Sequence, residues 1–236
     1  MNLIKNIIEP NRLLLTWMPP ERSGHQRKNR VVGELKKDGD NIVLQYCYET
    51  EDYKEAKECG FQTYPSFKNE KQIYNKGVLD TFIMRLPPRT RKDFDDFLKS
   101  IRINPEAKAK ITDFALLGYS EAKLPSDNFS IVHPFDNVLG PCEVLTEIAG
   151  SRYYLEEGQM LQIGDRVFLE FEQDNPFDAM AIQIIYQGKK IGYINRIQLP
   201  AFHRWLKEVE VAACIERING TKEKPRVFLF VSVTPK

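Results

Sequence analysis

From residue 144 to its end, the chain alternates short strand-like runs with turn residues, and this pattern constrains the fold more than any other feature. Only residues 198–209 place apolar side chains at helical spacing there. Six short strands and one helix within about 95 residues favour a small barrel or twisted sheet that closes to protect its edges. The predicted strands cover residues 144–149, 166–172, 181–186, 190–194, 211–217 and 226–233.

The part of the chain before this region mixes strand patterns with helical ones. Thr50 is placed to cap one short helix, and Asn104 and Pro105 are placed to begin another, which Gly118 would end. The predicted strands cover residues 12–17, 30–35, 42–48 and 129–134, and the predicted helices cover 51–59, 76–86, 93–101 and 105–118.

A loop rich in proline and glycine near residues 134–141 separates the two parts. We therefore predict an α+β protein of two domains. Residues 1–136 would form a mixed sheet with helices, and residues 140–236 would form a small β-barrel with one helix.

Composition and charge exclude several protein classes. The chain has 236 residues, of which 42% are hydrophobic and 28% charged, which is typical of a globular protein. A net charge of +1 argues against a globally basic nucleic-acid coat. The closest pair of its four cysteines, Cys47 and Cys59, has no knuckle spacing, which argues against a zinc site. We expect reduced thiols in a cytoplasmic protein with no signal peptide and no membrane span.

Motifs of the common catalytic classes are absent from the sequence. It has no GxxxxGK[ST], GxGxxG, HExxH or GxSxG segment, and no serine or cysteine stands in a familiar nucleophile context. We therefore expect a chain that is not an enzyme, with no catalytic residue, metal or cofactor.

Four segments in the second part form an ordered pattern. They are Ala-Gly-Ser-Arg-Tyr-Tyr at 149–154, Gly-Asp at 164–165, Asp-Asn-Pro-Phe-Asp at 174–178 with Ala-Ile at 181–182, and Gly-Lys-Lys-Ile-Gly-Tyr-Ile at 188–194. Together they resemble the HIRAN domain, over residues 140–236. The resemblance implies an OB-like barrel that binds single-stranded DNA and prefers a free 3′ end. It implies DNA-binding roles for Arg152, Tyr153, Tyr154, Asn175, Asp178, Tyr193, Arg196 and, on the last strand, Phe228.

The chemistry of these residue types fits that role. Bases stack on aromatic rings for about 1–3 kcal/mol each. In a strand Tyr153 and Tyr154 would point to opposite faces, so at most one of them would stack unless the segment turns. Arg152 can bind a phosphate through two parallel hydrogen bonds, and Asp178 and Asn175 can bond a 3′ hydroxyl. The sequence departs from the commonest family pattern at Phe177, where many members have Tyr, and at Tyr193, where some have His.

Structural roles remain open for the same residues. The two tyrosines could be the core and rim of a strand, residues 174–178 have the composition of a turn, and Arg196 could be a surface charge. From residue 140 onward, 12 basic side chains face 13 acidic ones, so DNA affinity would rest on a small local patch with a shallow salt dependence.

The first part resembles the small N-terminal subdomain of HipA-type toxin kinases. The resemblance rests on Leu-Leu-Thr-Trp at 14–17, Val-Gly-Glu-Leu at 32–35 and Val-Leu-Gln-Tyr at 43–46. It implies packing beside a kinase core, which this chain lacks. Two basic segments, residues 22–30 and 85–92, could contact a nucleic-acid backbone or could be ordinary solvated loops.

Three function hypotheses follow. The first is a non-catalytic bacterial protein that binds single-stranded DNA or DNA 3′ ends and recruits a partner in DNA repair, replication stress or defence. The alternative is a protein-interaction module, antitoxin-like or regulatory, that docks on a separate HipA-type kinase core. A nuclease subunit is a third hypothesis, for which the sequence has no metal-binding carboxylate motif.

Overall fold

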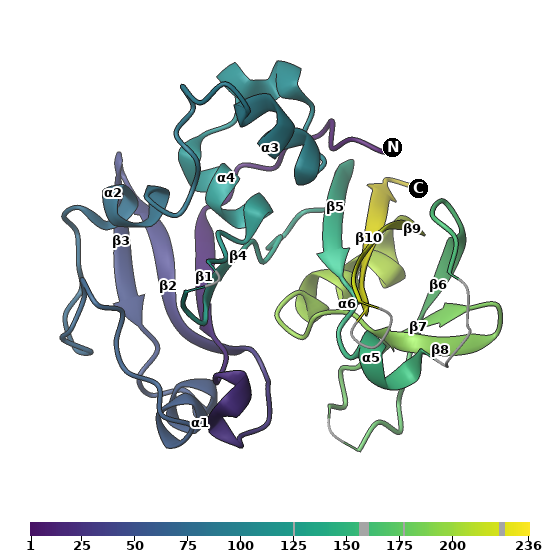
Figure 1. Ribbon diagram of the computed structural model, residues 1–236, viewed down its shortest axis with the longest axis horizontal. Coiled ribbons are helices and arrows are strands. Elements are labelled where there is room, and N and C mark those ends of the chain that lie inside the picture. Colours follow the sequence, from purple (N-terminus) through teal and green to yellow (C-terminus); the bar gives the residue numbers. More distant parts are fainter. Residues whose placement is uncertain (125, 156–160, 177, 222–224) are drawn as a thin grey trace. The chain divides into compact units, whose positions relative to one another are not determined.

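The chain folds into two compact units, described here from a computed structural model (Figure 1). The structure describes residues 1–124, 126–155, 161–176, 178–221 and 225–236. The N-terminal unit comprises Glu9–Phe97 and Ala107–Pro134, and the C-terminal unit comprises Met1–Ile8, Leu98–Glu106 and Phe135–Lys236. The domain limits 1–136 and 140–236 stay a prediction. Within the described residues, no helix is long and apolar enough to cross a membrane.

The N-terminal unit contains a four-stranded sheet in the order β3-β2-β1-β4. Every pairing in it is antiparallel, so the predicted mixed sheet is wrong. The β2–β3 connection is a tight turn at Gly39, and such short links join only antiparallel strands. The elements are β1 (Arg12–Trp17), β2 (Arg30–Asp38), β3 (Asn41–Tyr46), β4 (Phe129–Val132), α1 (Glu51–Glu58), α2 (Val78–Ile83) and α4 (Asp113–Ser120), while α3 (Phe94–Ser100) crosses the unit boundary.

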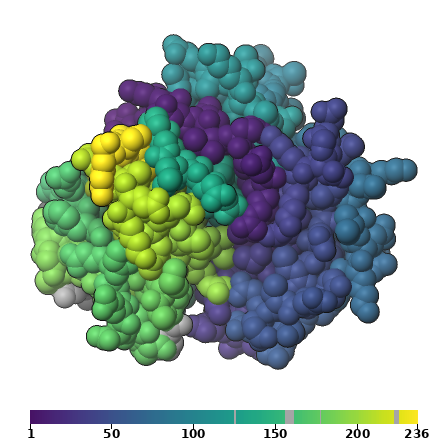
Figure 2. Space-filling view, turned by 180° about the vertical axis from the view of Figure 1, so that it is seen from behind, coloured from purple at the N-terminus to yellow at the C-terminus, as the bar shows by residue number. Residues whose placement is uncertain are grey.

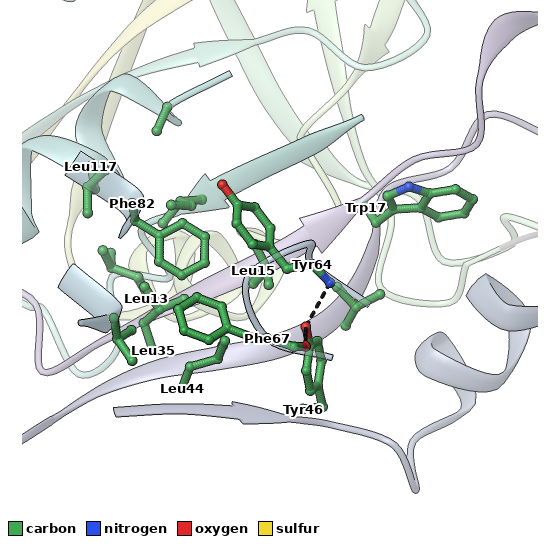
Figure 3. Close-up of a cluster of buried hydrophobic side chains, with 14 of the residues drawn as sticks. Leu13, Leu15, Trp17, Leu35, Leu44, Tyr46, Tyr64, Phe67, Phe82 and Leu117 are labelled. Carbon is green, nitrogen blue, oxygen red and sulfur yellow. Dashed lines mark hydrogen bonds between the residues drawn. The ribbon is translucent and has the colours of Figure 1, made fainter. Parts of the chain in front are cut away.

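The core of this unit forms because one face of each strand is apolar. The fully buried leucines of β1, β2 and β3 pack with aromatic residues from the segment after α1 (Figure 3); they are Leu13, Leu15, Leu35 and Leu44. The hydroxyl of Tyr46 accepts a hydrogen bond from the Tyr64 amide at 2.8 Å and donates one to the Phe67 carbonyl at 2.7 Å. A tyrosine of β3 thus holds the segment after α1 in place through its hydroxyl.

The structure confirms one predicted helix start and corrects another. The Thr50 side chain accepts a bond from the Tyr53 amide and caps α1. The helix expected from Asn104 to Gly118 is wrong, because a short 3-10 turn, Pro105–Ala109, ends before Thr112 caps α4 anew. Gly118 lies inside α4, where an added Cβ would stand 2.6 Å from a Leu13 methyl carbon, so close packing explains this glycine.

The C-terminal unit contains a six-stranded antiparallel sheet in the order β5-β10-β9-β6-β7-β8. In Figure 2 the end of β10, in yellow, lies beside the teal β5 segment, with which it pairs. The elements are β5 (Cys142–Glu147), α5 (Ser151–Tyr154), β6 (Arg166–Phe171), β7 (Ile182–Tyr186), β8 (Lys189–Tyr193), α6 (Leu199–Glu208), β9 (Glu210–Gly220) and β10 (Pro225–Thr234).

This sheet is not closed into the predicted barrel. The edge strand β5 ends at Glu147, before it could form a ladder with β8, and the chain turns at Gly150 (φ 74°) into α5. In the described residues, a single bridge between Ala149 and Tyr193 joins the two ends of the sheet. The sequence predicted one helix in this part of the chain, which is α6. The structure also contains the one-turn helix α5.

Two segments from the first half of the chain complete this unit. Ile4 forms a parallel bridge with Ile103, and the buried carboxylate of Glu216 accepts a bond from Arg102 Nε at 2.6 Å. The same carboxylate accepts a bond from Asn2 Nδ2 at 2.7 Å. These contacts explain why residues 1–8 and 98–106 belong with β9.

Candidate nucleic-acid interface

The segment with the two adjacent tyrosines forms a helical turn, not a strand in which the two rings would point to opposite faces. Gly150 has a left-handed backbone, and Ser151–Tyr154 then form one helical turn. In a helix, successive side chains point about 100° apart, not to opposite faces. Tyr153 consequently extends into solvent with 72% of its surface exposed, while Tyr154 is half-buried.

Tyr154 meets Tyr193, the last residue of β8. Their ring centroids are 5.4 Å apart, the ring planes are nearly perpendicular (81°), and the hydroxyls are 3.3 Å apart. The backbone of Tyr193 exchanges two hydrogen bonds with Ala149, at 2.8 and 2.9 Å, which holds β8 against the residue that precedes α5. Two residues distant in the sequence thus form one aromatic pair, as edge-to-face rings prefer.

A polar network surrounds the Tyr193 hydroxyl. It donates to Glu172 Oε2 at 2.8 Å and accepts bonds from Lys190 Nζ at 2.9 Å and Asn175 Nδ2 at 3.2 Å. The Glu172 carboxylate also accepts from Lys190 at 2.6 Å and from Asn175 at 2.6 Å. Lys190 Nζ lies 5.1 Å from the ring centroid of Tyr154 and 5.0 Å from that of Tyr193. We call Tyr154, Glu172, Asn175, Lys190 and Tyr193 the tyrosine cluster.

Sequence reasoning missed Glu172 and Lys190. Glu172 ends a predicted strand, and Lys190 lies inside the hairpin segment of the family pattern, so both stood beside recognised residues. Their meeting depends on the register of β7 and β8, where Gln183 opposes Tyr193 and Ile185 opposes Lys190 across a bulge. A sequence pattern does not determine such a register.

The electrostatics of the cluster follow from these contacts. Hydrogen bonds from Lys190, and then from Asn175, lower the pKa of Glu172 to about 2. The bond to Glu172 raises the pKa of Lys190 above its usual value, and burial is the largest cause that raises the pKa of Tyr193 to about 12. At neutral pH the cluster therefore contains a carboxylate, an ammonium and a neutral phenol.

The carboxylate should make the stability of this unit fall in acid. Because the folded pKa of Glu172 lies below its ordinary 4.5, its contribution is complete above about pH 4.5 and is lost as the pH falls toward about 2. Glu172→Gln should weaken this part of the pH dependence. Urea unfolding midpoints at several pH values compare the two proteins, and equal decreases between about pH 5 and 2.5 would contradict the prediction.

The turn after β6 uses two predicted site residues for local structure. Asn175 Oδ1 accepts a bond from the Asp178 amide at 3.0 Å, and Asp178 Oδ1 accepts one from the Met180 amide at 2.9 Å. These are the turn bonds expected of Asn and Asp. The Asn175 amide group also donates into the tyrosine cluster, so this residue connects the turn to the cluster. Phe177 lies outside the described residues.

The remaining predicted residues have other partners. The Arg152 guanidinium lies 4.6 Å from the ring centroid of Tyr153 and bonds its hydroxyl. Phe228 is half-buried, with the guanidinium carbons of Arg217 and Arg226 4.3 and 5.3 Å from its ring centroid. The structure thus groups Tyr154, Asn175 and Tyr193, and it places Arg152 with Tyr153 and Phe228 with two arginines. Arg196 is half-buried in the loop between β8 and α6.

The basic segment at residues 85–92 is not a free cationic loop. The Arg85 side chain is 2% exposed and bonds both oxygens of Asp127, so it is not available to a phosphate backbone. Arg89 donates to Asp113 and to the carbonyls of Lys108 and Ile111. The prediction that Arg85 contacts a nucleic-acid backbone is therefore wrong.

The cluster offers aromatic rings, a cation and amide and hydroxyl groups, which suit stacking and hydrogen bonding. Among the described residues, no group of three or more His, Cys, Asp or Glu side chains could hold a metal ion.

Two solved structures are similar to parts of this chain. The crystal structure of the HIRAN domain of human HLTF has 19% sequence identity, covers 42% of this chain and 78% of that chain, and has a TM-score of 0.34. A protein from Lactobacillus plantarum has 22% identity, covers 40% of this chain and 99% of that chain, and has a TM-score of 0.32. No curated protein matches the chain.

The family comparison concerns the C-terminal unit. The resemblance of residues 1–136 to HipA-type kinases stays a prediction, because the one family match concerns later residues. The family model of the HIRAN domain matches residues 143–233, a region that contains every residue of the tyrosine cluster. This region of the chain is therefore matched as a HIRAN domain.

Proposed function

We propose that the C-terminal unit binds single-stranded DNA, and its 3′ end in particular, at the tyrosine cluster. The observation that carries the proposal is the pairing of Tyr154 with Tyr193 beneath the Lys190 ammonium, within the region that matches the HIRAN domain. Proteins bind single-stranded nucleic acids with aromatic rings, on which bases stack, and with cations, which attract the phosphates.

Each chemical part of a DNA end finds a matching group in or near the cluster. A base stacks on the half-buried ring of Tyr154, and a phosphate is attracted by Lys190 and by the exposed guanidinium of Arg152. A 3′ hydroxyl can both donate and accept, so the Asn175 side chain and the Asp178 carboxylate suit it. Lys190 then shares its three donor hydrogens between Glu172, Tyr193 and the incoming phosphate.

The role that we propose is recognition without chemistry. The chain would hold a DNA end and bring a partner to it in DNA repair, replication stress or defence. Docking on a separate HipA-type kinase core is the alternative, in which the N-terminal unit would carry the interaction.

The expected result is that an end-blocked strand binds more weakly than a free one. Fluorescence anisotropy at low salt would compare short labelled strands that end in a 3′ hydroxyl or a 3′ phosphate. Tyr154→Ala should weaken binding of the free end about 5- to 150-fold, the equivalent of about 1–3 kcal/mol for one stacked base.

Tyr48→Ala is the matched control, since Tyr48 is a partly exposed tyrosine of the N-terminal unit. It should bind as the unchanged protein does. Equal affinity for the 3′ hydroxyl and the 3′ phosphate strands would mean that the site binds single strands without recognising their end. A lack of binding to either strand would contradict the proposal and favour a protein partner.

A further inference from the structure

We infer that the outer face of β6, β7 and β8 continues the binding site, as a track for the nucleotides that precede the 3′-terminal one. The base before the terminal one would lie on Ile185, next to the cluster, and Phe168 would stack the base that follows along the track. This inference rests on the proposed function, and it adds the path and the length of strand that the unit binds.

Strand pairing places Phe168 in line with the tyrosine cluster. Phe168 of β6 is opposite Ile185 of β7, and Ile185 is opposite Lys190 of β8. These three residues form one row across the sheet. Neighbouring strands lie about 4.8 Å apart, so the row extends about 10 Å from Lys190 to Phe168.

Burial shows which face this row occupies. Val167, Ile182, Ile184 and Ile191 are buried, whereas their neighbours Phe168, Ile185 and Lys190 are exposed or half-buried. This alternation is the pattern of a sheet with one face in the core and the other in solvent. Lys190 and Tyr193 share the outer face, since Lys190 Nζ bonds the Tyr193 hydroxyl.

Phe168 is unusual for an aromatic residue of a central strand. It is 58% exposed, whereas Phe171 on the same strand is 38% exposed and lies with its ring centroid 4.7 Å from that of His203. Since side chains alternate along a strand, Phe171 belongs to the opposite face. Exposed Arg166 is two residues before Phe168 and thus shares its face.

A nucleic acid fits this row better than other occupants. The row runs from a cation through an aliphatic side chain to an aromatic ring. Arg166, two residues before Phe168 on the same strand, supplies a second cation on this face. Bases can lie on Ile185 and Phe168 while phosphates approach the two cations. The carboxylate of Glu170 is in the adjacent row, opposite Gln183, with which it is hydrogen-bonded. A polyanion would therefore follow the row of Phe168.

The test compares strand length with the state of Phe168. Anisotropy would measure the affinity of the full chain for a dinucleotide and for a strand of about ten nucleotides, both with a free 3′ hydroxyl. The longer strand should bind more tightly. Phe168→Ala should weaken its binding about 5- to 150-fold and leave that of the dinucleotide unchanged.

Phe171→Ala is the matched control, because it removes a phenylalanine from the other face of the same strand. It should keep the advantage of the longer strand. If the dinucleotide binds but the longer strand gains nothing, or if Phe168→Ala keeps the gain, the track is wrong and the end site stands. If neither strand binds the unchanged protein, the proposed function itself fails.

Discussion

Gly192→Ala should destabilise the C-terminal unit by about 3–5 kcal/mol and abolish the tyrosine cluster. Gly192 has φ 144°, which L side chains rarely adopt. An added Cβ would stand 2.4 Å from Ile148 Cγ2 and 2.7 Å from the Ala149 carbonyl oxygen. The oxygen belongs to the backbone that pairs with Tyr193, so relief of the clash would pull β8 away from α5.

Urea unfolding in a Trp17→Phe background measures this effect, because Trp205 is then the single tryptophan and lies in the C-terminal unit. Gly188→Ala is the matched control. Gly188 also has a positive φ, of 77°, but a Cβ there would meet nothing within 4 Å. It should cost about 1 kcal/mol from backbone strain alone. An equal cost for both substitutions would contradict the argument from close contact.

Asp127→Ala should destabilise the N-terminal unit by about 3–5 kcal/mol, because it leaves a buried cation without its anion. The Arg85 side chain is 2% exposed and donates to both Asp127 oxygens, at 2.6 and 2.9 Å. Its remaining bonds, to the carbonyls of Ala122 and Phe129 among others, cannot neutralise the charge. Hydrogen exchange of the β1 and β4 amides would report the loss of stability in this unit.

Asp93→Ala is the control for this pair. Asp93 also accepts two bonds from one guanidinium, that of Arg91, but both side chains are more than half exposed. Solvent screens an exposed ion pair, so this change should be nearly neutral. If the two aspartates had the same effect, burial of the guanidinium would not be the cause.

Local sequence signals predicted elements well where neighbouring residues determine the structure. The alternation of Ile42, Leu44 and Tyr46 predicted a strand, and all three are buried in β3. Thr50 predicted a helix start, and its side chain caps α1. Such signals succeed because a cap or an alternating face depends on residues a few positions apart.

The same local reasoning failed where distant packing decided. Glycine commonly ends a helix, yet Gly118 lies inside α4. A glycine is needed there because Leu13 and His133 approach its backbone. Neither neighbour of Gly118 is close to it in the sequence.

Consecutive residues were sufficient to predict the order of the strands and the segments that resemble the HIRAN domain, because an alternating face and a short motif are both local patterns. The three-dimensional structure was needed to show that the sheet stays open and that Glu172 and Lys190 join Tyr154 and Tyr193 in one cluster. Those contacts depend on strand register, and a shift by one residue would turn these side chains to the other face.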